Sequence, residues 1–282
     1  MRTPGVGSTG NGVDTARPRP GESAGALRSA WTVARALARF LAFTASNLAL
    51  AALLLPGLAA TAGSPGGRVR FRNWIFRAWS RVSLRCAGIR LEVRGRPPAG
   101  PCYLVSNHIV YSDVWVLAAH TGAVFVAESG IARWPFFGVM ARAVSIIFVD
   151  RLNIRTLPEV NRSMEAAIAR GQVVAFFPES RTSTGRELLP FRSPLLAPAA
   201  RGEHPVAWAA IEYRTGANDP PASEVVVWPD GVSVASHAAR FLRLDRVDAR
   251  VTFGEQPLRG TDRKALAAEL RGRIGTIFVP MD

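Results

Sequence analysis

The chain has 282 residues, of which 48% are hydrophobic, so it is long and apolar enough for one substantial domain with a packed core and an N-terminal extension. Two cysteines, Cys86 and Cys102, are too few for a disulfide framework, and neither has a metal-ligand spacing. The formal net charge of +14 is unevenly placed, because residues 1–85 hold twelve arginines and only two acidic residues. Since this excess surrounds an apolar segment and no recognition motif for nucleic acid accompanies it, the charge favours an anionic membrane surface over nucleic acid as partner.

The N-terminal 85 residues divide into two segments by composition. Residues 1–25 are rich in Gly, Pro, Ser, Thr and Arg, which predicts a disordered arm. Residues 26–85 carry apolar side chains at helical spacing, which predicts a helical membrane-association segment. Within it, residues 40–55 form a charge-free run of 16 residues that ends at Pro56. A helix of that length is ~24 Å long and the hydrocarbon core is ~30 Å thick, so the run spans a membrane only if the helix continues through Pro56.

Arginines flank the apolar run symmetrically, with six before it and six after it in residues 1–85. The positive-inside rule therefore assigns no orientation. A hairpin or interfacial anchor, with both flanks on the cytoplasmic face of the cell inner membrane, explains the symmetry best. The alternatives are a single span, a signal peptide cleaved near Ala60-Thr61-Ala62, and a core helix of the following domain.

Residues 86–282 alternate between strand and helix patterns, which predicts an α/β catalytic domain with a mixed, mostly parallel sheet flanked by helices. The expected strands are 89–94, 103–106, 124–127, 146–149, 173–177, 204–211, 225–228 and 249–253. The expected helices are 113–120, 134–143, 157–170, 194–201, 233–241 and 262–277. Ligand sites in open α/β sheets gather at the carboxyl ends of the strands, so the residues directly after these strands are the candidates for a site.

A histidine follows the second expected strand, and an aspartate comes five residues later. Residues at i and i+5 do not share a helix face, so His108 and Asp113 meet only if His108 precedes the first helical turn and Asp113 lies inside it. Ser106 and Asn107 are good N-cap residues and place the junction between strand and helix here. An imidazole held by a carboxylate takes a proton from an alcohol near neutral pH, which makes the pair a candidate general base. The alternative is a capping histidine beside a solvated aspartate.

Four sequence blocks follow one another in an order that resembles the glycerolipid acyltransferase family, which includes the 1-acylglycerol-3-phosphate acyltransferases. The first block runs from Asn107-His108 to Asp113 and is the family's His-x4-Asp motif, and the second runs from Pro135-Phe136-Phe137-Gly138 to Ile147-Phe148-Val149-Asp150-Arg151. The third block is Phe176-Phe177-Pro178-Glu179-Ser180-Arg181-Thr182-Ser183. The fourth block is His204-Pro205-Val206-Ala207-Trp208. The resemblance extends over residues 102–211. Each block is modest alone, and their common order makes the signal strong.

The resemblance implies a membrane-associated O-acyltransferase that moves a fatty acyl group from acyl-CoA or acyl carrier protein to the free hydroxyl of a lysolipid. The expected acceptor is 1-acylglycerol-3-phosphate (lysophosphatidate), which gives phosphatidic acid; a lyso-ornithine lipid or another lysophospholipid is the alternative. His108 acts as the base and Asp113 orients its ring, so no covalent acyl-enzyme is required. The rivals are a thioester or lysolipid hydrolase, against which the lack of a Gly-x-Ser-x-Gly elbow counts, and a non-catalytic membrane-binding protein on the same fold.

A phosphate on the acceptor requires fixed cations. Arg151 is the main candidate because a guanidinium binds phosphate oxygens bidentately; its alternative is an ion pair with Asp150. Glu179 is expected to bind a glycerol hydroxyl or to hold Arg181, and its alternative is a structural hydrogen bond. The expected substrate-binding set is Asn107, Arg151, Glu179, Ser180, Arg181 and Arg192.

The chain departs from the family pattern at three positions. Ser145 and Ser180 stand where Gly is common, and Thr182 stands where Arg is usual, one position after Arg181. These departures leave the catalytic pair intact and leave the acceptor open. No P-loop, dinucleotide fingerprint or pair of histidines at metal spacing appears, so neither a cofactor nor a metal is expected.

Overall fold

The computed structural model describes residues 20–134, 137–202, 204–229 and 231–282. Within these residues, seven strands form one sheet in the order β1-β7-β6-β2-β5-β3-β4. Neighbouring strands are parallel except β6 and β7, which are antiparallel. The predicted α/β fold with a mixed, mostly parallel sheet is confirmed. The strands are β1 (Ile89–Arg94), β2 (Cys102–Ser106), β3 (Val124–Glu128), β4 (Ile147–Val149), β5 (Val173–Phe176), β6 (Val206–Thr215) and β7 (Val247–Phe253).

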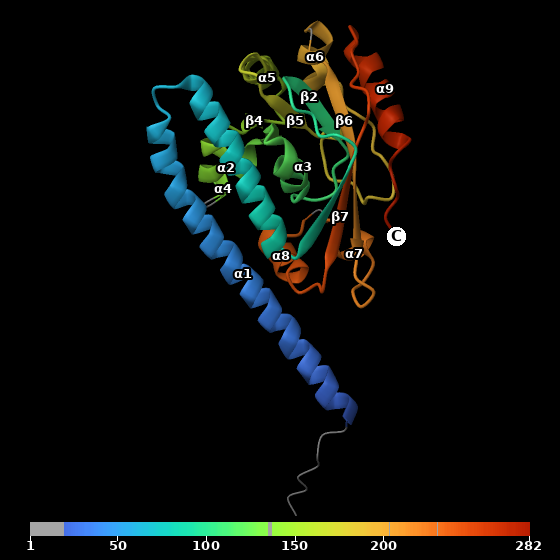
Figure 1. Ribbon diagram of the computed structural model, residues 1–282. Helices are drawn as coiled ribbons and strands as arrows, with labels where there is room; N and C mark the ends of the chain where they lie inside the picture. Colours follow the sequence, from blue (N-terminus) through green and yellow to red (C-terminus); the bar gives the residue numbers. More distant parts are fainter. Residues whose placement is uncertain (1–19, 135–136, 203, 230) are drawn as a thin grey trace, which may run out of the picture.

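Helices cover both faces of the sheet (Figure 1). One core cluster joins the sheet to α1 (Pro20–Ala60), α2 (Pro65–Cys86), α3 (Asp113–Thr121) and α8 (Val234–Phe241). The other joins it to α5 (Leu157–Ala169), α6 (Ala197–Arg201) and α9 (Arg263–Gly275). Strand β6 contributes alternate side chains to the two clusters, Ala207 and Ala209 to the first and Val206 and Trp208 to the second, as the period-2 geometry of a strand requires. The remaining helical elements are α4 (Phe137–Ala143), α7 (Ala222–Val225) and the 3₁₀ turns Ser129–Arg133, Ile154–Thr156 and Pro194–Leu196.

The strand predicted over residues 225–228 is wrong. Helix α7 ends at Val225, and the next three residues form no strand. Val226 and Val227 are nonetheless buried in the core that α8 covers. A run of β-branched residues indicates burial on an apolar surface as much as it indicates a strand. Here β7 pairs with β6 from Ala209 to Thr215, so no place beside that strand is left for the run.

The N-terminal segment forms a helical hairpin of α1 and α2 along one side of the domain (Figure 1). Helix α1 begins at Pro20, inside the segment predicted as a disordered arm; residues 1–19 lie outside the described residues. It continues through Pro56 and has 41 residues, which makes it ~62 Å long. Among the described residues it is the one helix long and apolar enough to cross a membrane, and only 17% of its most apolar window is buried. The alternative of a core helix is therefore excluded.

One side of α1 is attached to the domain. Asn47 accepts a hydrogen bond from the Trp79 indole of α2 at 2.8 Å, and Leu50 and Leu54 are buried near it. Nearer the N-terminus, the Arg39 guanidinium donates to the backbone carbonyls of Leu242, Leu244 and Asp245, which come after α8. The outward side stays apolar and exposed, at Trp31, Leu37, Phe40, Leu41, Leu48, Leu53 and Leu55.

Two serines adopt a left-handed backbone conformation. Among the described residues, eight have a positive φ angle; six are glycines, and the other two are Ser145 (φ 66°) and Ser180 (φ 63°). These are the two positions where the related family commonly has Gly. A side chain in this conformation brings Cβ close to the following carbonyl oxygen and costs roughly 1–2 kcal/mol. The family's glycine is thus explained by backbone geometry at both places.

We expect Ser145→Gly and Ser180→Gly each to raise the free energy of unfolding by about 1 kcal/mol, because relief of the strained φ outweighs the extra freedom that Gly gives the unfolded chain. Urea unfolding of the protein in detergent measures the change. Ser163→Gly in the middle of α5 is the control, and there we expect a loss of about 0.5 kcal/mol. A loss of stability in both positive-φ variants would contradict the strain argument.

Candidate active site

The sequence blocks converge on one edge of the sheet. Strands β2, β5, β3 and β4 are mutually parallel, so their carboxyl ends lie along the same edge. His108 follows β2, Glu179 follows β5 and Arg151 follows β4. Pro135 and Phe136 of the second block lie outside the described residues. This edge is therefore the candidate active site.

His108 and Asp113 are in direct contact. His108 lies in the loop after β2 and Asp113 is the first residue of α3, the arrangement that their spacing demands. The distance from Nδ1 of His108 to Oδ2 of Asp113 is 2.7 Å. The predicted N-cap is wrong, because Ser112 occupies that position and makes no side-chain cap bond. The Asp113 side chain instead accepts hydrogen bonds from the N–H groups of Ile109 and Val110, at 2.6 and 3.0 Å.

Asp113 is fully buried, and both of its carboxylate oxygens have partners. Oδ2 accepts from the His108 ring and from two backbone N–H groups, and Oδ1 accepts from the Tyr213 hydroxyl at 2.7 Å. The position at the first turn of α3 adds the favourable field of a helix N-terminus. These contacts stabilise the charged carboxylate and hold it in one orientation.

The imidazole of His108 has one orientation and one usable nitrogen. Because Nδ1–H donates to the carboxylate, Nε2 carries the lone pair. The ring stacks on Phe177, with centroids 4.0 Å apart and an angle of 7° between the planes. Its side chain is 13% exposed, so a small part of the ring faces outward. The pair can serve as an oriented general base.

Tyr213 is a site residue that the sequence reasoning missed. It lies on β6, two residues beyond the predicted end of that strand, and it is buried. Its hydroxyl donates to Asp113 and accepts from the Ser112 hydroxyl at 3.0 Å. Burial raises the pKa of Tyr213 well above the ordinary value, so the proton that it donates stays in place. The signal in the sequence was the alternation along the strand, which puts Tyr213 on the same face as Ala209 and Ile211.

Asn107 is fully buried and bonds the backbone of one residue twice. Its amide nitrogen donates to the Ile211 carbonyl at 2.9 Å, and its amide oxygen accepts from the Ile211 N–H at 2.8 Å. The side chain therefore ties the His108 loop to β6. The predicted contact of Asn107 with substrate stays a prediction, which these two bonds disfavour.

Glu179 is a buried carboxyl group close to the pair of His108 and Asp113. It is 4% exposed, and neither oxygen makes a well-formed hydrogen bond to a described residue. Burial raises the pKa of Glu179 to about 8; the nearby backbone of His108 lowers that pKa, and the charge of Asp113 raises it further. The expected hold on Arg181 is absent, since Arg181 is exposed and forms no ion pair with Glu179 among the described residues. The carboxyl group is thus protonated near neutral pH.

We expect Glu179 to make the wild-type protein less stable as pH rises. Between pH ~4.5 and ~8 the folded state keeps the proton that the unfolded state loses, so the free energy of unfolding falls by up to about 1.4 kcal/mol per pH unit. Glu179→Gln removes this slope, because the amide does not ionise. Urea unfolding between pH 5 and 9 measures the effect, with the exposed Glu187→Gln as control. If the free energy of unfolding changed with pH in the same way for wild type and Glu179→Gln, the Glu179 carboxyl group would be ionised in the folded protein over the whole pH range measured.

The three arginines predicted to bind the acceptor are exposed at or near this edge. Arg151 makes no ion pair with Asp150, whose carboxylate accepts from the Leu152 N–H at 2.9 Å. The Arg192 N–H donates to the Pro178 carbonyl at 2.7 Å and holds its segment beside the third block. Arg151, Arg181 and Arg192 are exposed residues, and their guanidinium groups form no ion pairs with described residues. Burial lowers the pKa of Arg151, and the nearby charge of Glu128 opposes this effect. Their contacts with substrate stay predictions.

Comparison with known proteins adds independent information. Residues 90–211 match the family model described as "Acyltransferase". The chain is 32% identical over 216 residues to a lyso-ornithine lipid O-acyltransferase of Rhizobium meliloti (strain 1021), covering 72% of this chain and 73% of the relative. It is 34% identical over 213 residues to a lyso-ornithine lipid O-acyltransferase of Brucella abortus (strain 2308), covering 70% and 79%.

A second group of relatives has a different acceptor in its name. The chain is 34% identical over 154 residues to a 1-acyl-sn-glycerol-3-phosphate acyltransferase of Neisseria gonorrhoeae, covering 54% of this chain and 60% of the relative. The crystal structure of the 1-acyl-sn-glycerophosphate (LPA) acyltransferase from Thermotoga maritima superposes with a TM-score of 0.66 over 89% of this chain and 97% of that one. At 14% identity, that structural likeness supports the fold alone.

Proposed function

Because the chain belongs to the acyltransferase family, we propose that it transfers a fatty acyl group from acyl-CoA or acyl carrier protein to the free hydroxyl of a lyso-ornithine lipid. At the coarser level, the chain is a lysolipid O-acyltransferase. The observation that carries the chemistry is the bond between His108 and Asp113 at the end of β2, which engages Nδ1 and leaves Nε2 as the nitrogen available to a substrate.

The transfer proceeds from this geometry in one displacement. Nε2 of His108 takes the hydroxyl proton while the acceptor oxygen attacks the thioester carbonyl. A C–O bond forms, the C–S bond breaks, and the imidazolium returns its proton to the departing thiolate. Asp113 stabilises the imidazolium and fixes the ring, as the carboxylate of a serine-hydrolase triad does. The acceptor hydroxyl takes the place of the serine, so no acyl-enzyme is formed.

The choice of acceptor is supported by the extent of similarity. The lyso-ornithine lipid O-acyltransferases align over 72% and 70% of the chain, whereas the Neisseria gonorrhoeae 1-acyl-sn-glycerol-3-phosphate acyltransferase aligns over 54% at the same level of identity. The second candidate is 1-acylglycerol-3-phosphate. It is favoured by Arg151, whose exposed guanidinium at the catalytic edge forms no ion pair with a described acid and suits a phosphate.

We place the protein at the cytoplasmic face of the inner membrane, with the exposed apolar side of α1 in the lipid. Trp31, Phe40 and Leu55 on this side suit the boundary between head groups and acyl chains. The bonds of Arg39 to the carbonyls after α8 then hold the catalytic domain at the surface where a lysolipid resides. A single span remains the alternative topology.

The test is acyl transfer by purified protein in detergent, with palmitoyl-CoA and a panel of lysolipids. We expect conversion of lyso-ornithine lipid. Conversion of lysophosphatidate alone would overturn the proposed acceptor and leave the chemistry standing. Free fatty acid formed without acceptor would indicate a hydrolase. Inactivity toward every acceptor, with donors on CoA and on acyl carrier protein, would favour a non-catalytic membrane protein.

A further inference from the structure

The β4–α5 loop, which comprises residues 150–156, carries two apolar side chains at its tip. Leu152 is 98% exposed and Ile154 is 75% exposed, which are the highest values for large apolar side chains among the described residues. Outside α1, α2 and this loop, only Val139 of α4 and Val279 after α9 are large apolar side chains that the described part of the chain exposes. Single exposed apolar residues are common on protein surfaces, whereas an apolar pair at one loop tip indicates a surface that a partner covers.

Hydrogen bonds within the loop hold its backbone in one shape. The Asp150 carboxylate accepts from the Leu152 N–H at 2.9 Å. The Asn153 side chain accepts from the Arg155 N–H at 3.2 Å. The Asn153 carbonyl accepts from the N–H and the hydroxyl of Thr156, at 3.1 and 2.8 Å. The apolar pair therefore belongs to a turn with its own bonds, in which Asp and Asn side chains bond the backbone two residues on.

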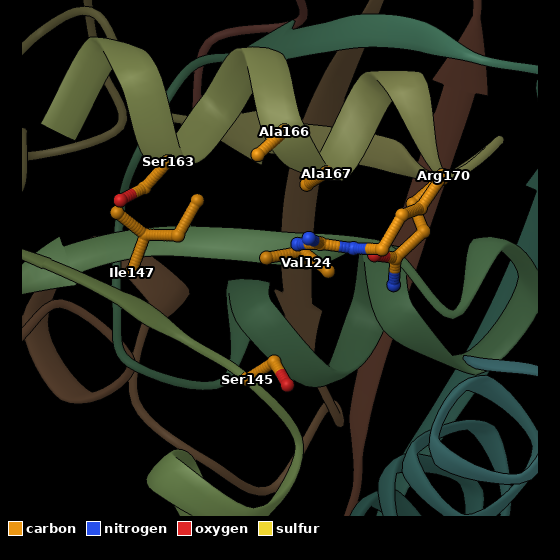
Figure 2. A pocket seen from close by; sticks show the side chains of 8 residues that line it. Val124, Ser145, Ile147, Ser163, Ala166, Ala167 and Arg170 are labelled. Atoms are coloured by element: carbon orange, nitrogen blue, oxygen red, sulfur yellow. The ribbon is translucent and has the colours of Figure 1, made fainter. Parts of the chain in front are cut away.

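Both ends of the loop are anchored in the domain. Before the loop, β4 pairs with β3, and after the loop, α5 buries Val160 and Met164 in the core. Figure 2 shows the side of α5 that faces the sheet, where Ala166 and Ala167 are turned toward Val124 of β3. Because both neighbouring elements are packed, the loop keeps its apolar tip outside the core.

The loop begins level with His108 on the same edge of the sheet. Through the register of β3 and β5, Ile147 of β4 is level with Val105 of β2. Asp150 comes three residues after Ile147, as His108 comes three residues after Val105, so the two lie side by side with three strand spacings between them. At ~4.8 Å between strands, this separation is roughly 14 Å. A bilayer in contact with the loop therefore presents its lipids beside His108.

The surroundings of the loop are basic. Residues 129–157 contain four arginines and a single acidic residue, Asp150. The four arginines are exposed and form no ion pair with a described residue; they are Arg133, Arg142, Arg151 and Arg155. Apolar side chains between cations are typical of elements that bind at an anionic membrane surface, because lipid phosphates neutralise the cations while the apolar groups leave water.

The loop projects from the side of the domain where the hairpin of α1 and α2 lies. The 3₁₀ turn Ser129–Arg133 contacts both β4 and α4. Met140 and Val144 of α4 belong to the core cluster that includes Leu50 and Leu54 of α1. Figure 1 draws β4 and α4 beside the hairpin. The apolar tip of the loop thus adds to the exposed apolar surface that α1 presents on this side of the domain.

We propose that the β4–α5 loop is a second membrane contact, which inserts Leu152 and Ile154 between the head groups of an anionic bilayer while Arg155 binds lipid phosphates. The contact brings the edge that holds His108 onto the surface from which the lysolipid comes. The inference rests on the proposed function for the lipid nature of the acceptor. It goes beyond that function because it assigns membrane binding to the α/β domain itself, in addition to α1.

The first test measures insertion without turnover. Leu152→Cys is labelled with an environment-sensitive fluorophore in a Cys86→Ser background, where the remaining Cys102 is buried. With phosphatidylglycerol vesicles we expect a blue shift of the emission and quenching by lipids that carry a doxyl group on the acyl chain. Ala268→Cys, an exposed site on α9, is the matched control and should show neither effect. A Leu152 label that stays unquenched on vesicle-bound protein would refute the insertion.

The second test compares a lysolipid embedded in vesicles with a short-chain lysolipid dissolved in water. The double variant Leu152→Ser, Ile154→Ser should raise the apparent KM for the embedded acceptor about tenfold, because the apolar contact is lost, and leave kcat/KM for the dissolved acceptor unchanged. Arg155→Gln should weaken binding to phosphatidylglycerol vesicles about fivefold and leave binding to phosphatidylcholine vesicles unchanged. Val279→Ser, at another exposed apolar side chain, is the matched control.

Other outcomes would overturn the proposal. An equal loss with the embedded and the dissolved acceptor would place the loop in the active site itself. A higher KM for palmitoyl-acyl carrier protein and not for palmitoyl-CoA, with unchanged vesicle binding, would assign the loop to the carrier protein. A protein that is inactive toward every lysolipid while its Leu152 label is quenched would refute the proposed function and keep this inference. Unfolding midpoints identify any variant that fails to fold.

Discussion

His108→Ala is expected to lower kcat/KM for acyl transfer by at least about 10³-fold, because the substitution removes the base that Asp113 orients. In the variant no base takes the proton of the acceptor hydroxyl as it attacks, and no acid protonates the departing thiolate. Alanine also leaves the Asp113 carboxylate without the ring that it orients, while the backbone N–H groups of Ile109 and Val110 still hold that carboxylate in place. The folded state is therefore expected to survive.

The measurement is the initial rate with palmitoyl-CoA and the best acceptor of the panel, with wild type and variant at equal protein concentration. His120→Ala is the matched control, since His120 is an exposed histidine on α3 and should keep the wild-type rate. Vesicle binding and the unfolding midpoint should be unchanged in both variants. Residual activity within tenfold of wild type would show that His108 is not the base.

Asp113→Asn is expected to lower kcat by about 10²–10³-fold with a small change in KM, because the amide keeps the shape of the side chain and loses its charge. An imidazolium forms during the transfer, and an uncharged partner stabilises it less. Asparagine also places an NH₂ group where one carboxylate oxygen accepted. We expect the NH₂ group to take the place of Oδ1, because the Tyr213 hydroxyl can rotate and accept a hydrogen bond from it.

Tyr213→Phe separates charge from position in the same network. It removes the donor to Oδ1 and keeps the bond between Asp113 and His108, so we expect a loss of only about tenfold. Rates at saturating acceptor, measured for both variants and for wild type, test whether Tyr213→Phe loses less activity than Asp113→Asn. A Tyr213→Phe variant as slow as Asp113→Asn would show that the hydroxyl, rather than the charge alone, sets the activity of the pair.

Local sequence signals were enough for much of the site. The spacing of His108 and Asp113 predicted a junction between strand and helix, and the two side chains meet there. The alternation of apolar segments predicted the α/β sheet, because the central strands β2 and β5 bury both faces and each is a short apolar run in the sequence. The roles of Arg151, Arg181 and Arg192 stay predictions, since exposed side chains take their positions from the ligand.

Other features depend on contacts between distant parts of the chain. Tyr213 reaches Asp113 across 100 positions, and no local pattern distinguishes it from any other buried strand residue. The departures at Ser145 and Ser180 were visible in the sequence, yet only the φ angles show that both carry backbone strain.

The sequence by itself determined the family and the fold class of the protein, because the family motifs are local segments and binary patterning selects the α/β fold. Only the tertiary structure decided which surfaces remain exposed and which distant charges become neighbours. It left the outer side of α1 exposed, although the composition of α1 had kept a core helix open as an alternative. It also brought Arg35 of α1 into an ion pair with Asp245, which lies 210 positions farther along the chain. Burial and proximity are properties of the packed chain, and a local pattern carries neither.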